Sequence, residues 1–247
     1  MDVAGWSVLV TGATSGFGEA IARRFVLAGA HVVGTGRRSE RLEALAAELG
    51  PRFSPRCFDV RDDAARQREL AGLVPDLLVL NAGLALGAGP VWKAEVDDVE
   101  TMIATNVRAV AMLVRELLPD MVARRHGHLV LLGSVAGSAP YPGGNVYGGT
   151  KAFVSQYAQN LRADLVGTGI RATVIEPAMC ETEFSVVRFH GDAEAARRVY
   201  AGMLPLTATD IAETVWWVAT CPPHMTVSRV ELFPTAQAHG PFQVART

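Results

Sequence analysis

Short runs of apolar residues alternate with amphipathic stretches along almost the whole chain. Several of these runs are apolar at nearly every position, which is typical of strands in a parallel sheet that is covered on both faces. We interpret as strands residues 7–10, 30–34, 53–58, 77–80, 128–132, 171–175 and 227–232. We interpret as helices residues 18–28, 40–49, 96–124, 146–166 and 209–220.

This alternation of strands and helices favours βαβ units in one sheet. We therefore predict an α/β fold with a single doubly wound parallel sheet and helices on both faces. No repeat, low-complexity tract or linker divides the sequence, so residues 1–247 are expected to form a single dinucleotide-binding and catalytic domain. Residues 178–206 are too long for an ordinary connection, and we expect them to form a small helical lobe that covers the substrate.

Composition and charge argue against several classes of protein. The chain is 49% hydrophobic and 19% charged, so it can bury a large core. The formal net charge of -2 indicates no basic face for nucleic acid. No apolar run is long enough to span a membrane, and the N-terminus lacks the basic region of a signal peptide. The isolated Cys57, Cys180 and Cys221 indicate reduced thiols in a cytoplasmic protein and no metal site.

A glycine-rich loop follows the first predicted strand. Its glycines allow a tight turn, a close approach of the backbone to a pyrophosphate, and close helix–strand packing. The helix after the loop offers free N–H groups and the positive end of its dipole. A glycine triplet alone is often only a turn, but this position favours dinucleotide binding. The predicted phosphate contacts are Gly12, Thr14, Ser15, Gly16, Phe17 and Gly18.

The end of the second predicted strand indicates which dinucleotide binds. An NAD site usually has an acidic residue there to hold the ribose 2′-hydroxyl. This chain has Arg37 and Arg38 and no acid before Glu40. Guanidinium groups suit a 2′-phosphate because their planar fork binds it with two hydrogen bonds. NADP is therefore the predicted cofactor, although either arginine could instead face solvent.

Three side chains suggest acid–base chemistry at the carboxyl ends of the strands. Tyr147 and Lys151 lie four residues apart on a predicted helix and so share a face, and Ser134 ends the fifth predicted strand. An ammonium about 4 Å from the phenol would favour the phenolate by ~4 kcal/mol at an effective dielectric of 20. Tyr147 could then exchange a proton with a carbonyl oxygen that Ser134 holds. Taken singly, these residues could be surface groups or a helix cap.

In this order the motifs resemble the short-chain dehydrogenase/reductase family over the whole chain. The resemblance rests on the glycine loop, Asn81-Ala82-Gly83, Asn106, Ser134 and Tyr147-x-x-x-Lys151. It implies a Rossmann-like domain, a catalytic tetrad of Asn106, Ser134, Tyr147 and Lys151, and a homotetramer. It also implies that Lys151 holds the nicotinamide ribose and that Asn106 helps to hold a water. The further cofactor contacts that it implies are Asp59, Val60, Asn81, Ala82, Gly83, Pro177 and Thr182.

A narrower resemblance is to the NADP-dependent 3-hydroxy acid dehydrogenases. Residues 16–19, 35–38, 143–148, 182–185 and 187–189 carry it. It implies an oxidoreductase that interconverts a short 3-hydroxy acid, or a similar small anionic alcohol, and its oxo form. Residues 179–181 depart from that pattern, so a sulfoacetaldehyde reductase or another small-carbonyl reductase stays an alternative. The alternative outside enzymes is an NADP-sensing binding protein, which usually requires a broken Tyr/Lys pair.

An anionic substrate in a closed site needs a cation, because an unpaired buried charge is costly. Arg188 lies between the apolar Val187 and Phe189 in the expected lobe, and we predict that it binds the anion. It could also be a surface residue or part of an interface salt bridge. Asn145, two residues before Tyr147, is a predicted neutral helper at the wall of the substrate pocket.

Overall fold

The computed structural model describes residues 2–240, and within them seven strands form one sheet. All strand pairs are parallel, in the order β3-β2-β1-β4-β5-β6-β7. The order reverses between β1 and β4, which is where doubly wound sheets bind ligands. The predicted fold class is confirmed. The strands are β1 (Ser7–Thr11), β2 (His31–Gly36), β3 (Phe53–Cys57), β4 (Leu77–Leu80), β5 (Gly127–Leu132), β6 (Ile170–Pro177) and β7 (Arg229–Leu232).

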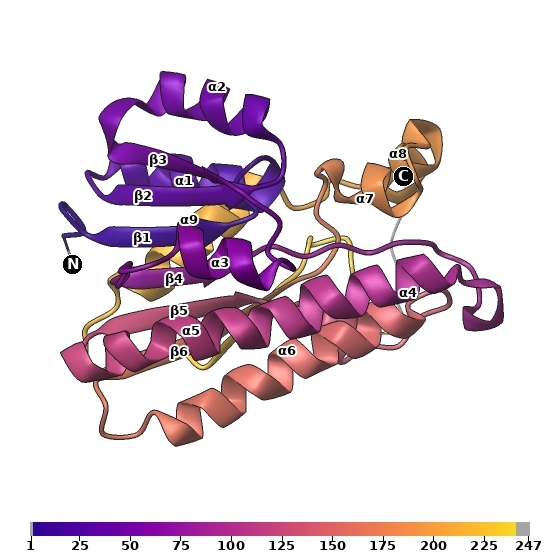
Figure 1. Cartoon of the computed structure of the whole chain (residues 1–247). Coiled ribbons are helices and arrows are strands. Elements are labelled where there is room, and N and C mark those ends of the chain that lie inside the picture. The colour runs from indigo at the N-terminus through magenta and orange to yellow at the C-terminus, as the bar shows by residue number, and fades with distance from the viewer. Residues whose placement is uncertain (1, 241–247) are drawn as a thin grey trace.

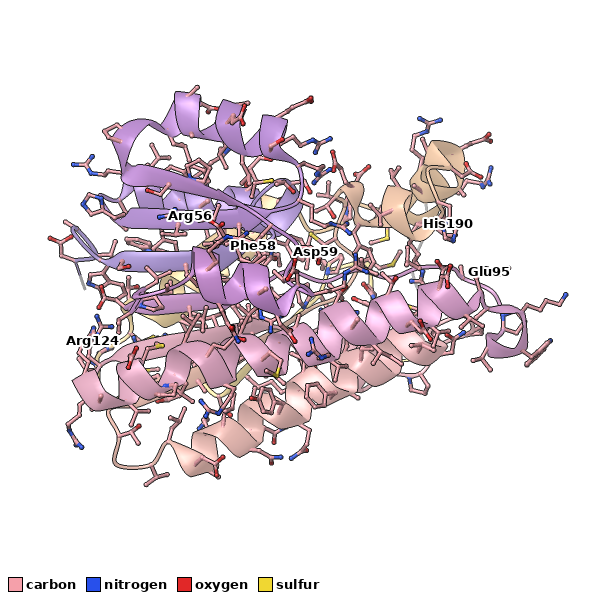
Figure 2. All side chains as sticks on the ribbon, viewed as in Figure 1. Arg56, Phe58, Asp59, Glu95, Arg124 and His190 are labelled. Carbon is pink, nitrogen blue, oxygen red and sulfur yellow. The ribbon has the colours of Figure 1, made fainter. Side chains whose placement is uncertain are left out.

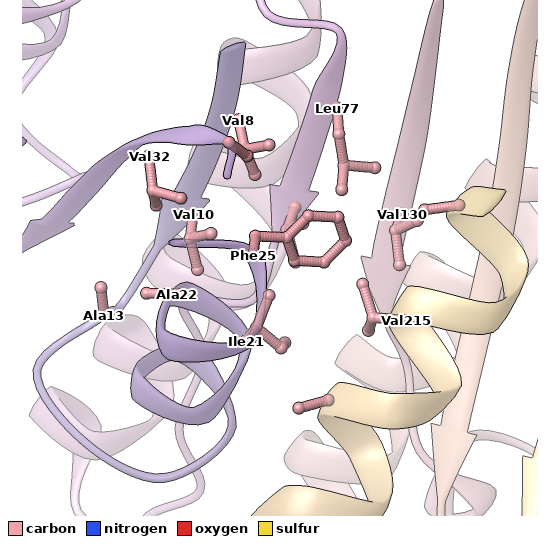
Figure 3. Packing of buried hydrophobic residues seen from close by; sticks show 14 of the residues in the cluster. Val8, Val10, Ala13, Ile21, Ala22, Phe25, Val32, Leu77, Val130 and Val215 are labelled. Atoms are coloured by element: carbon pink, nitrogen blue, oxygen red, sulfur yellow. The ribbon is translucent and has the colours of Figure 1, made fainter. Parts of the chain in front are cut away.

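Helices cover both faces of the sheet (Figure 1). One apolar cluster joins the sheet to α1 (Gly16–Leu27), α2 (Ser39–Leu49) and α9 (Ala208–Thr220). In it, Ile21 and Phe25 of α1 pack between β1 and Val215 of α9 (Figure 3). A second cluster joins the other face to α3 (Asp63–Glu69), α5 (Ala109–Arg124) and α6 (Asn145–Asp164). Burial on both faces explains why β1, β4 and β5 are mostly apolar, whereas most positions of the edge strands β3 and β7 are exposed or half-buried.

The lobe after β6 consists of two short helices, α7 (Glu183–Arg188) and α8 (Ala193–Tyr200). Figure 1 shows both beyond the carboxyl ends of the strands. The two ends of the lobe meet at a parallel bridge between Cys180 and Leu206, where Glu181 N donates to Leu206 O at 2.9 Å. The lobe is therefore closed at its base by backbone hydrogen bonds, which accounts for a connection of this length.

The predicted helix 96–124 is not continuous. It consists of α4 (Val96–Ile103), a π-helical turn (Ala104–Arg108) and α5. The extra residue of a π turn changes which side chains face inward, and such turns are frequent at functional sites. The sequence pattern also did not predict α3 in the connection before β4. Short 3₁₀ turns are η1 (Gly50–Arg52), η2 (Val91–Lys93) and η4 (Val135–Gly137).

Two further expectations concern membrane-spanning helices and the state of the cysteines. Among residues 2–240, none of the helices has both the length and the apolar character needed to cross a membrane. Cys57 is exposed, Cys180 and Cys221 are buried, and all three are free thiols.

Candidate active site

A cleft of about 330 Å³ opens at the carboxyl ends of the strands, where the strand order reverses. It extends from the end of β2 to the lobe, and the predicted residues line it with four exceptions, Gly18, Asn106, Asn145 and Arg188. Those that line it are Gly12, Thr14, Ser15, Gly16, Phe17, Arg37, Arg38, Asp59, Val60, Asn81, Ala82, Gly83, Ser134, Tyr147, Lys151, Pro177 and Thr182.

The glycine loop has the shape that a dinucleotide phosphate requires. Gly12 and Gly16 adopt φ of 72° and 56°, which side chains rarely tolerate. Gly18 does not face the cleft, because it packs on the strand: a Cβ there would lie 2.2 Å from Gly12 O. Ser15 precedes α1 without capping it through its side chain, so the helix keeps N–H groups for phosphate oxygens. The loop therefore fits the pyrophosphate of the expected cofactor.

Asn81 ties the end of β4 to this loop. Its Nδ2 donates to Thr11 O at 2.8 Å and to Gly12 O at 3.2 Å. Thr11 Oγ1 in turn accepts hydrogen bonds from the backbone N of Asn81 and Ala82, each at 3.0 Å. The Asn81 amide thus fixes the conformation of the glycine loop and joins the carboxyl end of β4 to that of β1.

Three arginines gather at the end of β2, where the 2′-phosphate was expected. Arg38 donates to Ser15 Oγ at 2.7 Å and to Thr14 Oγ1 at 2.8 Å. Arg37 is more exposed and lies 3.8 Å from Asp59, which Figure 2 shows just beyond β3. Arg41, which the sequence analysis did not select, is also in the group. The end of β2 itself contributes no acid, so this cluster fits a phosphate.

The lobe reaches this arginine cluster through Glu183. The carboxylate of Glu183 accepts hydrogen bonds from Arg38 Nη1 at 2.9 Å and Arg41 Nη1 at 2.7 Å. Burial acts to raise the pKa of Glu183, but the two guanidiniums outweigh it and hold that pKa below its ordinary value. Glu183 and Arg41 were missed because the sequence places them 142 residues apart, with no local signal that they meet.

Tyr147, Lys151 and Ser134 meet on the floor of the cleft. Lys151 Nζ donates to Leu132 O at 2.7 Å and lies 5.8 Å from the centre of the Tyr147 ring. Burial raises the pKa of Tyr147, whereas a hydrogen bond with Ser134 and the charge of Arg188 lower it. Burial also lowers the pKa of Lys151 to about 8. The phenol and the ammonium do share one helix face, as the spacing predicted, but the ammonium is anchored on β5 rather than on the phenol.

Asn106 and Asn145 lie outside the cleft lining. The π turn brings the buried amide of Asn106 to Leu84, where it bonds the backbone N at 2.9 Å and the backbone O at 2.7 Å. It also donates to Thr150 Oγ1 at 3.0 Å. Asn145 is exposed and donates to Gly89 O at 3.0 Å. The structure therefore does not place Asn145 at the substrate wall, because its amide caps a neighbouring loop.

Arg188 stands at the lobe side of Tyr147. Its guanidinium donates to Gly87 O at 3.2 Å, Tyr141 Oη at 3.0 Å and Gly143 O at 3.0 Å, and lies 6.0 Å from the centre of the Tyr147 ring. These bonds attach the lobe to the loops after β4 and β5. Arg188 is therefore near the reacting phenol, and it also supports the lobe.

Two hydroxyl residues that the sequence analysis missed also lie in the lobe. Tyr200 Oη donates to Cys180 O at 2.8 Å and lies 2.7 Å from the buried Ser185 Oγ. Both residues belong to the expected lobe, but nothing in their spacing distinguishes them from packing residues.

The model of the short chain dehydrogenase family matches residues 7–192. The serine 3-dehydrogenase of Agrobacterium fabrum is 51% identical over 245 residues, covering 97% of this chain and 98% of that protein. The NADP-dependent 3-hydroxy acid dehydrogenase YdfG of Escherichia coli is 51% identical over 97% of this chain and 99% of its own length. A solved closed form of serine dehydrogenase complexed with NADP+ has a TM-score of 0.93 and 50% identity, covering 98% of this chain and 100% of that chain.

Proposed function

The chain belongs to the short-chain dehydrogenase family, and we propose that it interconverts a short 3-hydroxy acid and its oxo form with NADP. The relatives named above support this substrate class and this cofactor. The observation that carries the proposal is the joint position of Tyr147, Lys151 and Ser134 in a cleft that begins at a phosphate loop.

The side chains divide the work of the reaction. A bound NADP would supply or accept the hydride, and the phosphate loop with Arg37 and Arg38 would hold the cofactor. Tyr147 gives a proton to the carbonyl oxygen in reduction and removes it in oxidation. Ser134 orients that oxygen by a hydrogen bond. Lys151 contributes a positive charge near the Tyr147 ring. Asn106 acts indirectly, because its amide fixes Leu84 and Thr150 around Lys151.

The anionic group of the substrate is assigned to the lobe side of the cleft. Arg188 lies within 6.0 Å of the Tyr147 ring centre, and its charge acts on Tyr147. A carboxylate beside Tyr147 would therefore meet a guanidinium that backbone oxygens already orient. A sulfonate has the same charge and would fit the same group, so sulfoacetaldehyde is the second candidate substrate.

Three further expectations concern the domain organisation, the location and the assembly of the protein. We propose that residues 1–247 act as a single domain, that the protein is cytoplasmic, and that it assembles as a homotetramer. Size-exclusion chromatography with light scattering tests the assembly. A mass near four times 26.3 kDa is expected, and a monomer would contradict this part of the proposal.

Consumption of NADPH tests the function directly. The full-length protein is mixed with NADPH and with malonic semialdehyde, sulfoacetaldehyde or uncharged aldehydes of similar size. We expect the absorbance of NADPH to fall fastest with malonic semialdehyde. Preference for sulfoacetaldehyde would shift the substrate assignment, and cofactor binding without consumption would identify an NADP-sensing protein instead.

Arg188→Ala tests whether Arg188 binds the anionic group of the substrate. We expect KM for an anionic aldehyde to rise about tenfold or more, since a charge-assisted hydrogen bond contributes ~1.5–3 kcal/mol. A neutral aldehyde of similar size should be almost unaffected. Tyr141→Phe is the matched control, because it removes an acceptor of Arg188 and leaves the guanidinium in place. Equal losses on both aldehydes would mean that Arg188 only supports the lobe.

A further inference from the structure

A buried carboxylate that the reaction described above does not use lies on β6. Glu176 is buried, with its side chain 1% exposed. Its side chain accepts a hydrogen bond from Ser155 Oγ of α6 and forms an ion pair with Arg229 Nε of β7. Removing a carboxylate from water costs several kcal/mol even when it is paired. The presence of a carboxylate at this buried position therefore needs an explanation in its surroundings.

Three relations place Glu176 beside Lys151. Ser155, which holds the carboxylate, lies one turn after Lys151 on the same face of α6. Lys151 Nζ donates to Leu132 O of β5. The side chain of Glu176 crosses the next residue, Gly133, where a Cβ would lie 2.8 Å from Glu176 Cγ and 3.4 Å from its Oε1. The ammonium is thus held at Leu132, the last residue of β5, and the Glu176 side chain passes the next residue in the chain.

We propose that Glu176 is a positioning residue that keeps Lys151 in its ammonium form. Burial lowers the pKa of Lys151 to about 8, and the charge of Glu176 acts in the opposite direction. Without that charge, the pKa of Lys151 would be lower still. The effect on turnover rests on the proposed function, because it is there that Lys151 contributes its charge.

The other charged groups around this pair do not cancel the effect. Arg229 faces Glu176 from β7, and Glu231 in turn binds Arg229. The Arg229 side chain is 35% exposed, so water screens its charge, whereas that of Glu176 is 1% exposed. Tyr147 faces Lys151 from the same helix and is neutral in its phenol form. Glu176 therefore acts on Lys151 through the protein interior, where charges interact more strongly.

The composition of the chain makes Lys151 directly observable. The sequence contains two lysines, Lys93 and Lys151, and Lys93 is exposed. Protein labelled with ¹³Cε-lysine therefore gives two NMR signals, which Lys93→Arg assigns. The pH titration of each signal reports its own ammonium, so Lys93 is an internal reference in the same sample.

We expect Glu176→Gln to lower the titration midpoint of Lys151 by about one pH unit or more, because a nearby opposite charge favours the ammonium and the variant lacks that charge. The midpoint of Lys93 should stay the same. Ser155→Ala is the matched control, because it removes the hydrogen bond to the carboxylate but keeps its charge, and it should leave Lys151 almost unchanged. Glu176→Met provides a second uncharged variant if Glu176→Gln does not fold.

An unchanged Lys151 midpoint in a folded Glu176→Gln or Glu176→Met protein overturns the proposal. A downward shift equally large in Ser155→Ala would also overturn it, because packing rather than charge would then set the midpoint. The titration needs no turnover, so its outcome is separate from that of the NADPH assay. In an active enzyme, the pH above which kcat for reduction falls should be lower in the Glu176→Gln and Glu176→Met variants than in the unmodified protein.

Discussion

The floor of the cleft and the lobe above it are held by different kinds of interaction. On the floor, Tyr147 and Lys151 are each less than one-tenth exposed, as is Asn106 next to the floor, and Lys151 and Asn106 bond to backbone atoms in the interior. The lobe is attached by groups that water reaches. In its ion pairs with Arg38 and Arg41, the side chains of Glu183 and its partners are 42–47% exposed.

This difference indicates where rigidity and adaptability lie. An exposed ion pair contributes about 0–1 kcal/mol, so the contacts of Glu183 with Arg38 and Arg41 can break and re-form. A buried polar group that loses its partner costs ~1–3 kcal/mol, so the floor keeps a single arrangement. The proposed chemistry, which depends on exact positions, is thus located on the floor, and the proposed selection of ligands is located where the lobe meets the sheet.

The largest effect is expected on the floor. Tyr147→Phe removes the proton donor but retains the ring and its 5.4 Å contact with the Phe184 ring. We expect kcat to fall by about 10²–10⁴, the range for a lost general acid–base group. Steady-state kinetics measure the loss, and titration with NADPH should show that cofactor affinity survives. A variant that keeps a third of its kcat would rule out Tyr147 in this role.

A smaller effect is expected at the arginine cluster, where the lobe meets the sheet. Replacing Arg37 and Arg38 with Ala should weaken NADPH binding by at least about tenfold, since hydrogen bonds to charged groups contribute ~1.5–3 kcal/mol. NADH lacks the phosphate and should be much less affected, so the ratio of the two KM values is the measurement. Arg52 and Arg115 are exposed and outside the cleft lining, and their double Ala variant controls for net charge. Equal losses of both cofactors would refute the 2′-phosphate assignment.

The smallest effect is expected at the lobe. Glu183→Gln keeps the size of the side chain but removes its ion pairs with Arg38 and Arg41. Amide hydrogen exchange in residues 183–200 should accelerate by up to about fivefold for each pair lost, while exchange in β5 and α6 stays the same. Acceleration in β5 as well would show that the lobe and the floor are one cooperative unit.

The sequence alone predicted those features that depend on residues close together in the chain. Apolar runs predicted the central strands, because both faces of β1, β4 and β5 had to be buried. The edge strands β3 and β7 contain polar and exposed positions, and their place in the alternation of strands and helices indicated them. The phosphate loop was predictable because its glycines lie within seven residues of one another. The shared face of Tyr147 and Lys151 followed from the helical period. The break in the predicted helix at Asn106 was not predictable, since the π turn Ala104–Arg108 contains no proline or glycine that would interrupt a helix.

Only the tertiary structure decided which distant side chains meet. Glu183 contacts Arg38 across 145 residues, and Arg188 contacts Gly87 across 101. In the sequence, Glu176 is one polar residue near the end of a predicted strand. Only the pairing of β5 with β6 brings it close to Lys151. Periodicity states which face of an element a residue occupies, but not which element will cover that face. Packing of the whole chain determines that partner, and with it the charge that each side chain experiences.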